Sequence, residues 1–264
     1  MLACALALLA TPAFGQEADC IEDLARSIES IQRGRYPALT RCLRFGNYDN
    51  CAETDAHSAA HENELRRRLT GTKSDCVRAV DAGVTLDRLG PTECPAAGAD
   101  CDVAVGAIST LDDLAECAVC VLLGIDRGYR QGLGLPSERP DDVDDRRCAR
   151  SLAVVAGKSG RKGVKQAFRC ARGGVQPFAC PADATDGTRF AKALAVIERK
   201  AGKCPVDGGG QLTGVGPSLC DAAATTRAEL AACVQALMRD RVCRTVNFGL
   251  GQSQDCDAFA ATPR

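Results

Sequence analysis

Cysteine is the most chemically versatile residue type in this chain, which has 17 cysteines among 264 residues. A thiolate can attack a disulfide or bind a metal, and two thiols can join in a structural disulfide. Cys117 and Cys120 form a C-x-x-C motif, the spacing of many thiol-disulfide exchange sites. Such a site needs its thiolate at a helix N-terminus, whereas the residues before Cys117 already follow a helical pattern. We therefore favour a structural role for this pair, with thiol-disulfide exchange at Cys117/Cys120 as the alternative.

The only two histidines, His57 and His61, lie four residues apart and would share one face of a helix. Two imidazoles at this spacing can bind one metal ion, but zinc needs a third and usually a fourth ligand. The metalloprotease motif H-E-x-x-H is absent, since residue 58 is serine. We interpret both as helix-surface histidines, with metal binding at His57 and His61 as the open alternative. No cofactor is expected.

Basic residues are concentrated between residues 146 and 182, where nine Lys and Arg residues occur and no acid. If the glycines among them permit a helix, six of these residues share one stripe: Lys158, Arg161, Lys162, Lys165, Arg169 and Arg172. A solvated face is the simplest interpretation. The stripe could instead bind an anionic ligand, or dock against the segment 75–117, whose net charge is −7.

The overall composition restricts the class of protein. The net charge is −1, hydrophobic residues make up 45% and charged residues 25%, as in soluble globular proteins. A disordered chain, a collagen-like chain and a polytopic membrane protein are thereby excluded, and no nucleic-acid partner is expected. Tryptophan is absent and aromatic residues make up only 4%, so the core buries little area per residue and depends on cross-links.

Residues 1–15 predict a signal peptide. The segment is uncharged and apolar, and small residues at Ala13 and Gly15 favour cleavage before Gln16. Cleavage would remove Cys4 and leave 16 cysteines, an even number suited to disulfides in an oxidising compartment. We expect a periplasmic or secreted protein with no transmembrane segment after signal cleavage.

The remaining cysteines indicate an internal duplication. Spacings of 22, 9 and 25 residues separate four cysteines of the first half: Cys20, Cys42, Cys51 and Cys76. Spacings of 22, 10 and 24 residues separate their counterparts: Cys148, Cys170, Cys180 and Cys204. We divide the mature chain into a Cys-rich helical repeat over 20–125, a linker over 126–146 and a second repeat over 147–258.

Apolar residues at helical spacing predict an all-α fold, with two tandem disulfide-stapled repeats. Each repeat would be a helical hairpin plus one or two further helices. A helix over 55–69 would have the ion pairs Glu62/Arg66 and Glu64/Arg68 on its outer face. Thr226 and Glu229 form a capping box, and Thr110 is the corresponding cap in the first repeat.

Pro37 and the glycines at 157, 160 and 163 are expected to kink the first helix of each repeat.

Nearly equal arms predict how the hairpin cysteines pair. In an antiparallel hairpin the outer two cysteines meet at one end and the inner two at the other. The predicted bonds are Cys20–Cys76, Cys42–Cys51, Cys148–Cys204 and Cys170–Cys180. Each long loop closed in this way stabilises the fold by about 4 kcal/mol in the chain-entropy model. Spacing does not determine how the other eight cysteines pair.

Cys-bounded helices rich in Ala, Lys and Arg alternate along the chain, as in the segment RKAGKC from Arg199 to Cys204. This pattern resembles uncharacterised Cys-rich helical-repeat proteins exported by environmental bacteria, and the resemblance implies no activity. We expect a non-catalytic binding or structural protein. Its partner would be another protein or an anionic envelope or extracellular polymer.

Overall fold

The computed structural model describes residues 16–31, 56–94, 106–134, 140–172, 189–220, 224–251 and 253–261. Within these segments the chain is all-α, with three isolated β-bridges and no β-strand, which confirms the predicted fold class. The first helix occupies residues 16–31. The others are α2 (Ala56–Thr70), α3 (Asp75–Asp81), α4 (Leu86–Leu89), α5 (Leu111–Leu133), α6 (Val143–Arg172), α8 (Arg189–Ala201), the 3-10 turn η1 (Gly216–Ser218), α9 (Arg227–Leu250) and α10 (Cys256–Ala261).

Two of the long helices, α5 and α9, begin and end in the same way. Each starts on a capping box, built by Thr110 with Asp113 and by Thr226 with Glu229. The threonine oxygen accepts a backbone N–H of the first turn, and the acid accepts N–H groups that precede the helix. Each helix stops at a glycine in the left-handed conformation, Gly134 and Gly251, where a side chain would be strained. The sequence motif at Thr226 is thus confirmed, and the cap at Thr110 is a full capping box.

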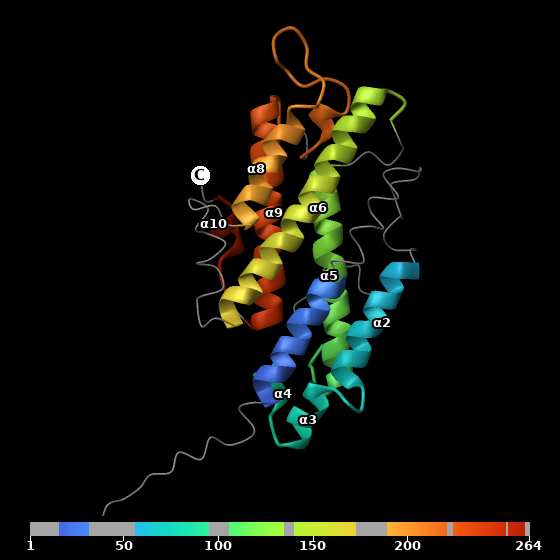
Figure 1. The fold of residues 1–264 in the computed structure, drawn as a ribbon, viewed down its shortest axis with the longest axis vertical. Coiled ribbons are helices and arrows are strands. Elements are labelled where there is room, and N and C mark those ends of the chain that lie inside the picture. The colour runs from blue at the N-terminus through green and yellow to red at the C-terminus, as the bar shows by residue number, and fades with distance from the viewer. Residues whose placement is uncertain are drawn as a thin grey trace, which may run out of the picture.

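The long helices run along the length of the molecule, and the helix over 16–31 with α2, α3 and α4 forms one end of it (Figure 1). Helices α6, α8 and α9 pack against one another, α5 packs against α9 and α2, and α10 packs against α9. The predicted apolar stripes face these contacts. Leu24, Ile28 and Ile31 are buried in the first helix, and Phe190, Leu194, Ile197 and Ala201 are buried in α8.

The glycines do not interrupt the first helix of the second repeat, because α6 runs unbroken through all three, and the kinks expected there stay a prediction. One of these glycines brings helices together. A Cβ at Gly163 would lie 2.6 Å from Val242 Cγ2 and 2.8 Å from Phe190 Cε2, so only a glycine lets α6 approach α8 and α9 this closely. Pro37 lies outside the described residues.

Five disulfides join described cysteines. Two close the long arms, Cys20–Cys76 and Cys148–Cys204, each with a sequence separation of 56, as the equal arms predict. The others are Cys94–Cys117, Cys220–Cys233 and Cys243–Cys256, which spacing did not determine. Cys170 and Cys120 are also disulfide-bonded, and their partners lie outside the described residues. Cys42, Cys51 and Cys180 lie outside them as well, so the two short predicted bonds stay predictions.

One predicted surface ion pair has a different role. Glu64 accepts from Arg68 at 2.8 Å, as expected, but Arg66 donates from Nε and Nη2 to both carboxylate oxygens of Glu116 on α5, at 2.6 and 3.0 Å. Arg66 therefore joins α2 to α5 by a half-exposed ion pair.

Helices also extend into the predicted linker, since α5 continues to Leu133 and α6 begins at Val143. The division into two repeats stays a prediction.

Candidate functional site: a cavity framed by disulfides

The two cysteines of the C-x-x-C motif are bonded to different partners. Cys117 pairs with Cys94, and it has no exposed surface. Cys120 is 8% exposed and disulfide-bonded as well. Helix α5 begins at Leu111, so Cys117 and Cys120 lie beyond its first turn. Neither sulfur is therefore at the helix N-terminus, which would stabilise a thiolate. This arrangement cross-links the fold and does not resemble an exchange site.

The histidine pair lies on α2, as predicted, but only the side chain of His61 is among the described residues. The ring of His61 lies 3.0 Å, at Nδ1, from the hydroxyl of Ser30 on the first helix. The side chain of His57 lies outside the described residues. Among the described residues, no group of three or more His, Cys, Asp or Glu side chains could hold a metal ion.

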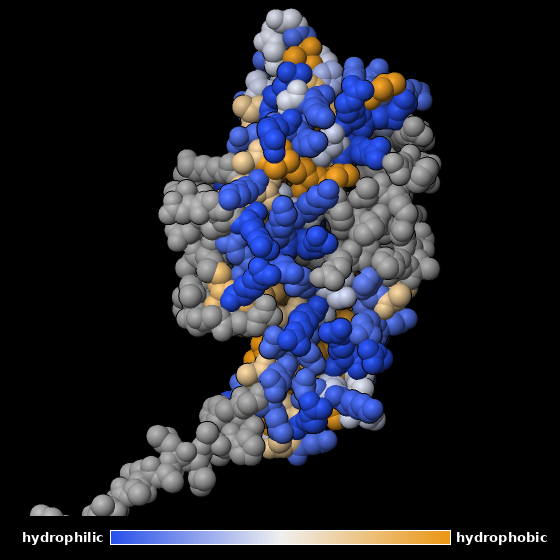
Figure 2. Space-filling view, viewed as in Figure 1, coloured by the Kyte–Doolittle hydropathy of each residue, from blue (hydrophilic) through white to orange (hydrophobic). Residues whose placement is uncertain are grey.

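The basic stripe lies on the continuous helix α6, where hydrophilic residues cover much of the visible face (Figure 2). Lys158, Lys162 and Arg169 are exposed, whereas Arg161 is half-buried. Lys165 is held by an ion pair with Glu29 of the first helix at 3.1 Å. The side chain of Arg172 lies outside the described residues.

The exposed part of the stripe continues onto α8. The pKa of Lys200 is lowered chiefly by the charge of Lys203, with smaller contributions from burial, Arg199 and Lys158. A lysine is harder to protonate where cations outweigh anions. This surface, formed by Lys158 of α6 with Arg199, Lys200 and Lys203, is called the basic face below.

The structure contains a cavity of about 1150 Å³ between the first helix, α4, α5, α9 and α10. The sequence patterns did not predict it. Binding sites for small molecules commonly have volumes of roughly 300–1,000 Å³, so this cavity is large enough for one. Its apolar lining comes from four of these helices and includes Ile21, Leu89, Val121, Ile125, Leu237 and Phe248. Gly128 of α5 also lines it, and a Cβ there would meet nothing within 4 Å.

One wall of the cavity is the segment from Asp87 to Thr92, which contains most of α4 and the three residues after it. Thr92 O accepts the N–H of Ile108 at 2.8 Å, and the N–H of Cys94 donates to Gly106 O at 3.0 Å. The disulfide Cys94–Cys117 then joins the end of this segment to α5. The wall is thus fixed to the helix on the other side of the cavity.

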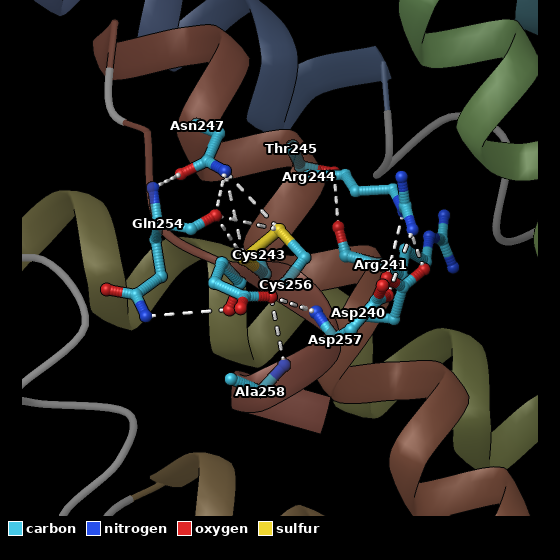
Figure 3. Close-up of a disulfide and its surroundings, with 11 residues drawn as sticks. Asp240, Arg241, Cys243, Arg244, Thr245, Asn247, Gln254, Cys256, Asp257 and Ala258 are labelled. Atoms are coloured by element: carbon cyan, nitrogen blue, oxygen red, sulfur yellow. Dashed lines mark hydrogen bonds and ion pairs between the residues drawn. A yellow bond between two sulfur atoms is a disulfide. The ribbon is translucent and has the colours of Figure 1, made fainter. Parts of the chain in front are cut away.

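A second wall is α10 with the turn before it. Figure 3 shows how these residues contact α9. The disulfide Cys243–Cys256 bonds α10 to α9. Asn247 of α9 donates to Gln254 O at 2.8 Å and accepts the Gln254 N–H at 3.1 Å. Oδ1 of Asp255 caps α10 by accepting the N–H groups of Asp257 and Ala258 at 3.0 and 3.1 Å. All of these contacts lie between residues 243 and 258, so this wall is formed by one short stretch of the chain.

Two arginines at the cavity, Arg244 and Arg88, are paired with carboxylates. Arg244 Nε donates to both carboxylate oxygens of Asp240 at 2.8 and 2.9 Å, and its Nη2 lies 3.6 Å from Asp257 Oδ1. The hydrogen bonds to Asp240 raise the pKa of Arg244 further above its usual value. At the other wall Arg88 forms an ion pair with Glu17 of the first helix.

No motif marks this cavity, because its lining comes from segments far apart in the sequence. One signal was present. Gly124 and Gly128 lie four residues apart within the helical pattern of α5, and glycine inside a helix indicates a close contact or an open space beside it.

No protein-family model matches the chain, and neither the curated proteins nor the solved structures include a significant match. The resemblance to exported Cys-rich repeat proteins therefore stays an expectation. Within the described segments, every helix is too short or too polar to serve as a transmembrane span. The several disulfides indicate an oxidising, non-cytoplasmic environment.

Proposed function

We propose that this is an exported, non-catalytic binding protein whose ligand occupies the cavity between α5 and α9. The proposal rests on the way in which the cavity is framed. Three disulfides are close to its lining residues in the sequence: Cys20 precedes Ile21, Cys94 follows Thr92 by two residues, and Cys256, bonded to Cys243, lines the cavity itself. A cavity held open by covalent bonds is pre-organised, so little entropy is lost when a ligand binds.

Native mass spectrometry of the folded protein, produced in a disulfide-forming compartment of its host, tests this proposal. The wild-type protein should retain a small molecule. Gly128→Phe should lose it, because the ring would occupy the cavity. Ala232→Phe is the matched control, since Ala232 is an exposed residue of α9 that does not line the cavity. Equal retention of a ligand by all three proteins would contradict the proposed site.

Export is the second part of the proposal, and the predicted signal peptide over 1–15 supports it together with the disulfides. N-terminal sequencing of protein recovered from outside the cytoplasm should begin at Gln16. Recovery of the protein in the cytoplasm with reduced cysteines would contradict it.

A second candidate function is capture of an anionic envelope or extracellular polymer by the basic face. The observation that favours it is the grouping of Lys158, Arg199, Lys200 and Lys203 on one surface, where the neighbouring cations also lower the pKa of Lys200. The protein should elute from heparin at a salt concentration that falls when Lys200 and Lys203 of the basic face are changed to Glu. Lys73→Glu, in the exposed turn after α2, is the control. Unchanged elution of the double variant would exclude this function.

A further inference from the structure

The basic face lies on two helices that run side by side in opposite directions. The disulfide Cys148–Cys204 joins the first part of α6 to the turn after α8, with 4.5 Å between the two Cα atoms. Toward the other end of the pair, Gln166 Oε1 on α6 accepts the N–H of Phe190, near the start of α8, at 3.1 Å. Cations on the outer side of this helix pair therefore belong to one surface.

Four further exposed cations continue this surface beyond the basic face. They are Lys162 and Arg169 of α6 and Arg189 and Lys192 of α8. Ser159 Oγ donates to Ala193 O at 3.0 Å, and Lys162 and Lys192 both lie within one helical turn of that contact. The basic face together with these four residues is called the cationic strip below.

Few acids interrupt the cationic strip. The sequence of α6 has no acid after Asp145, and that of α8 has only Glu198. Glu198 Oε1 accepts from Gln235 Nε2 at 3.1 Å, so this carboxylate is directed toward α9. Next to the strip, Glu29 of the first helix pairs with Lys165. The strip thus has a large excess of positive charge, although the net charge of the whole chain is −1.

The cationic strip is long and regular. Lys158 and Arg169 lie about 16 Å apart along the axis of α6, and the cations between them follow at intervals of three or four residues, about 5–6 Å. An acidic polysaccharide with one charge on each sugar has its charges at a similar interval. Each exposed ion pair contributes little by itself, so a partner binds well only if it contacts several of these cations at once.

A membrane surface fits the strip less well than a polymer. Proteins that bind at a lipid interface add the burial of apolar side chains to the attraction of charges. Among the described residues, the large hydrophobic side chains that are exposed are Val80 and Val143, and both lie outside the strip.

We infer that the cationic strip binds a linear anionic polysaccharide, which lies along α6 and α8 and contacts the strip with several of its charged sugars. The inference rests on the second candidate function, because it extends the basic face into a longer site and names the class of polymer. Affinity should therefore rise with chain length until the polymer covers the strip.

Oligogalacturonates of increasing length, which have one carboxylate on each sugar, test this mode of binding. The full disulfide-bonded chain is titrated with each length by calorimetry at low salt. The dissociation constant should fall at least about tenfold from the dimer to the length that covers the strip, and should then level off. Added salt should weaken the binding of the long oligomers.

Charge reversals locate the polymer. Lys162→Glu with Lys192→Glu changes the strip outside the basic face and should weaken binding of a long oligomer at least about tenfold. Arg67→Glu with Lys73→Glu is the matched control, because it changes the net charge equally at exposed positions in and after the last turn of α2, and it should leave the affinity unchanged. Circular dichroism checks the helical content of each variant, and glutamine at positions 162 and 192 provides a milder change should glutamate impair folding.

The outcomes separate the strip from the basic face. Weaker binding in Lys200→Glu with Lys203→Glu, but not in the variants of Lys162 and Lys192, would overturn the inference and leave the second candidate function in place. An affinity that does not depend on oligomer length would also overturn the inference. Tighter binding to vesicles of an anionic phospholipid than to any oligomer would overturn it in favour of a membrane surface. Equal losses in the control, or no loss in any variant of α6 and α8, would overturn the inference and the second candidate function together.

Discussion

At the scale of single residues, glycines in two helices have opposite roles. Gly163 of α6 lies where a Cβ would overlap Val242 and Phe190, whereas Gly128 of α5 faces open space. In the sequence, Gly163 and Gly128 are each a glycine within a helical pattern. Only their surroundings in the fold distinguish the two positions. A matched pair of substitutions measures this difference.

Gly163→Ala should destabilise the protein by about 1–3 kcal/mol, because overpacking outweighs the better helix propensity of alanine. Gly128→Ala should stabilise it by up to about 1 kcal/mol, because only the propensity changes. Urea unfolding of both variants beside the wild type gives the two free energies. Equal effects of the same sign would contradict the close packing of α6 on α8 and α9.

The ion pair between Arg66 and Glu116 should make stability depend on pH. The hydrogen bonds from Arg66 hold the pKa of Glu116 below its usual value of 4.5. The stabilisation is therefore present above pH 4.5 and is lost as the pH falls through the lower pKa of the folded state. Glu116→Gln should cost about 0.5–1 kcal/mol near neutral pH, since both side chains are about one-third exposed, and much less in acid.

Urea unfolding at neutral and acid pH checks this prediction, and a double-mutant cycle with Arg66→Gln isolates the pair. A coupling energy that does not decrease in acid would show that the charge of Glu116 contributes nothing to the contact between α2 and α5.

At the scale of elements, α10 is the wall most dependent on a single covalent bond. It is only six residues long, and Phe259 is its one buried side chain. Replacing Cys243 and Cys256 together with serine should cost about 2–3 kcal/mol, as expected for a short closed loop. Amide exchange should accelerate first in residues 253–261, and binding in the cavity should weaken because α10 forms a wall.

The bond Cys220–Cys233 has the same sequence separation of 13 and provides the control. Serine at both of its positions should also lower stability, but neither cysteine lines the cavity, so binding should persist. Loss of binding in both double variants would mean that general stability, and not the position of α10, determines binding.

Sequence patterns predicted the elements well where the information was local. The capping box at Thr226, the buried stripe of α8 and the pairing of Cys20 with Cys76 all follow from spacing along one chain segment or from two equal arms. The partner of Arg66 could not be predicted in this way, because Glu116 is 50 residues away and the closer Glu62 has the ideal helical spacing. The partner of Cys94 was equally inaccessible, since four cysteines lie within a short stretch.

At the scale of the whole molecule, the cross-links and the cavity are parts of one architecture. With no tryptophan and few aromatic residues, the core is made of Leu, Ile, Val and Ala on helices that glycines allow to approach closely. Disulfides fix the segments that such a core does not cover, which include both walls of the cavity. Four separate stretches of the chain, at residue 21 and over 87–92, 121–131 and 237–257, must meet before the cavity exists, so no sequence motif could have predicted it.

The central claim is that the cysteines serve as structural cross-links around a binding cavity and not as a redox centre. Disulfide mapping of the native, unreduced protein by peptide mass spectrometry tests it most directly. We predict linked peptides for Cys94–Cys117 and Cys243–Cys256, and no free thiol at Cys117 or Cys120. A Cys117–Cys120 bond, or a readily reducible pair there, would contradict this claim and favour thiol-disulfide exchange.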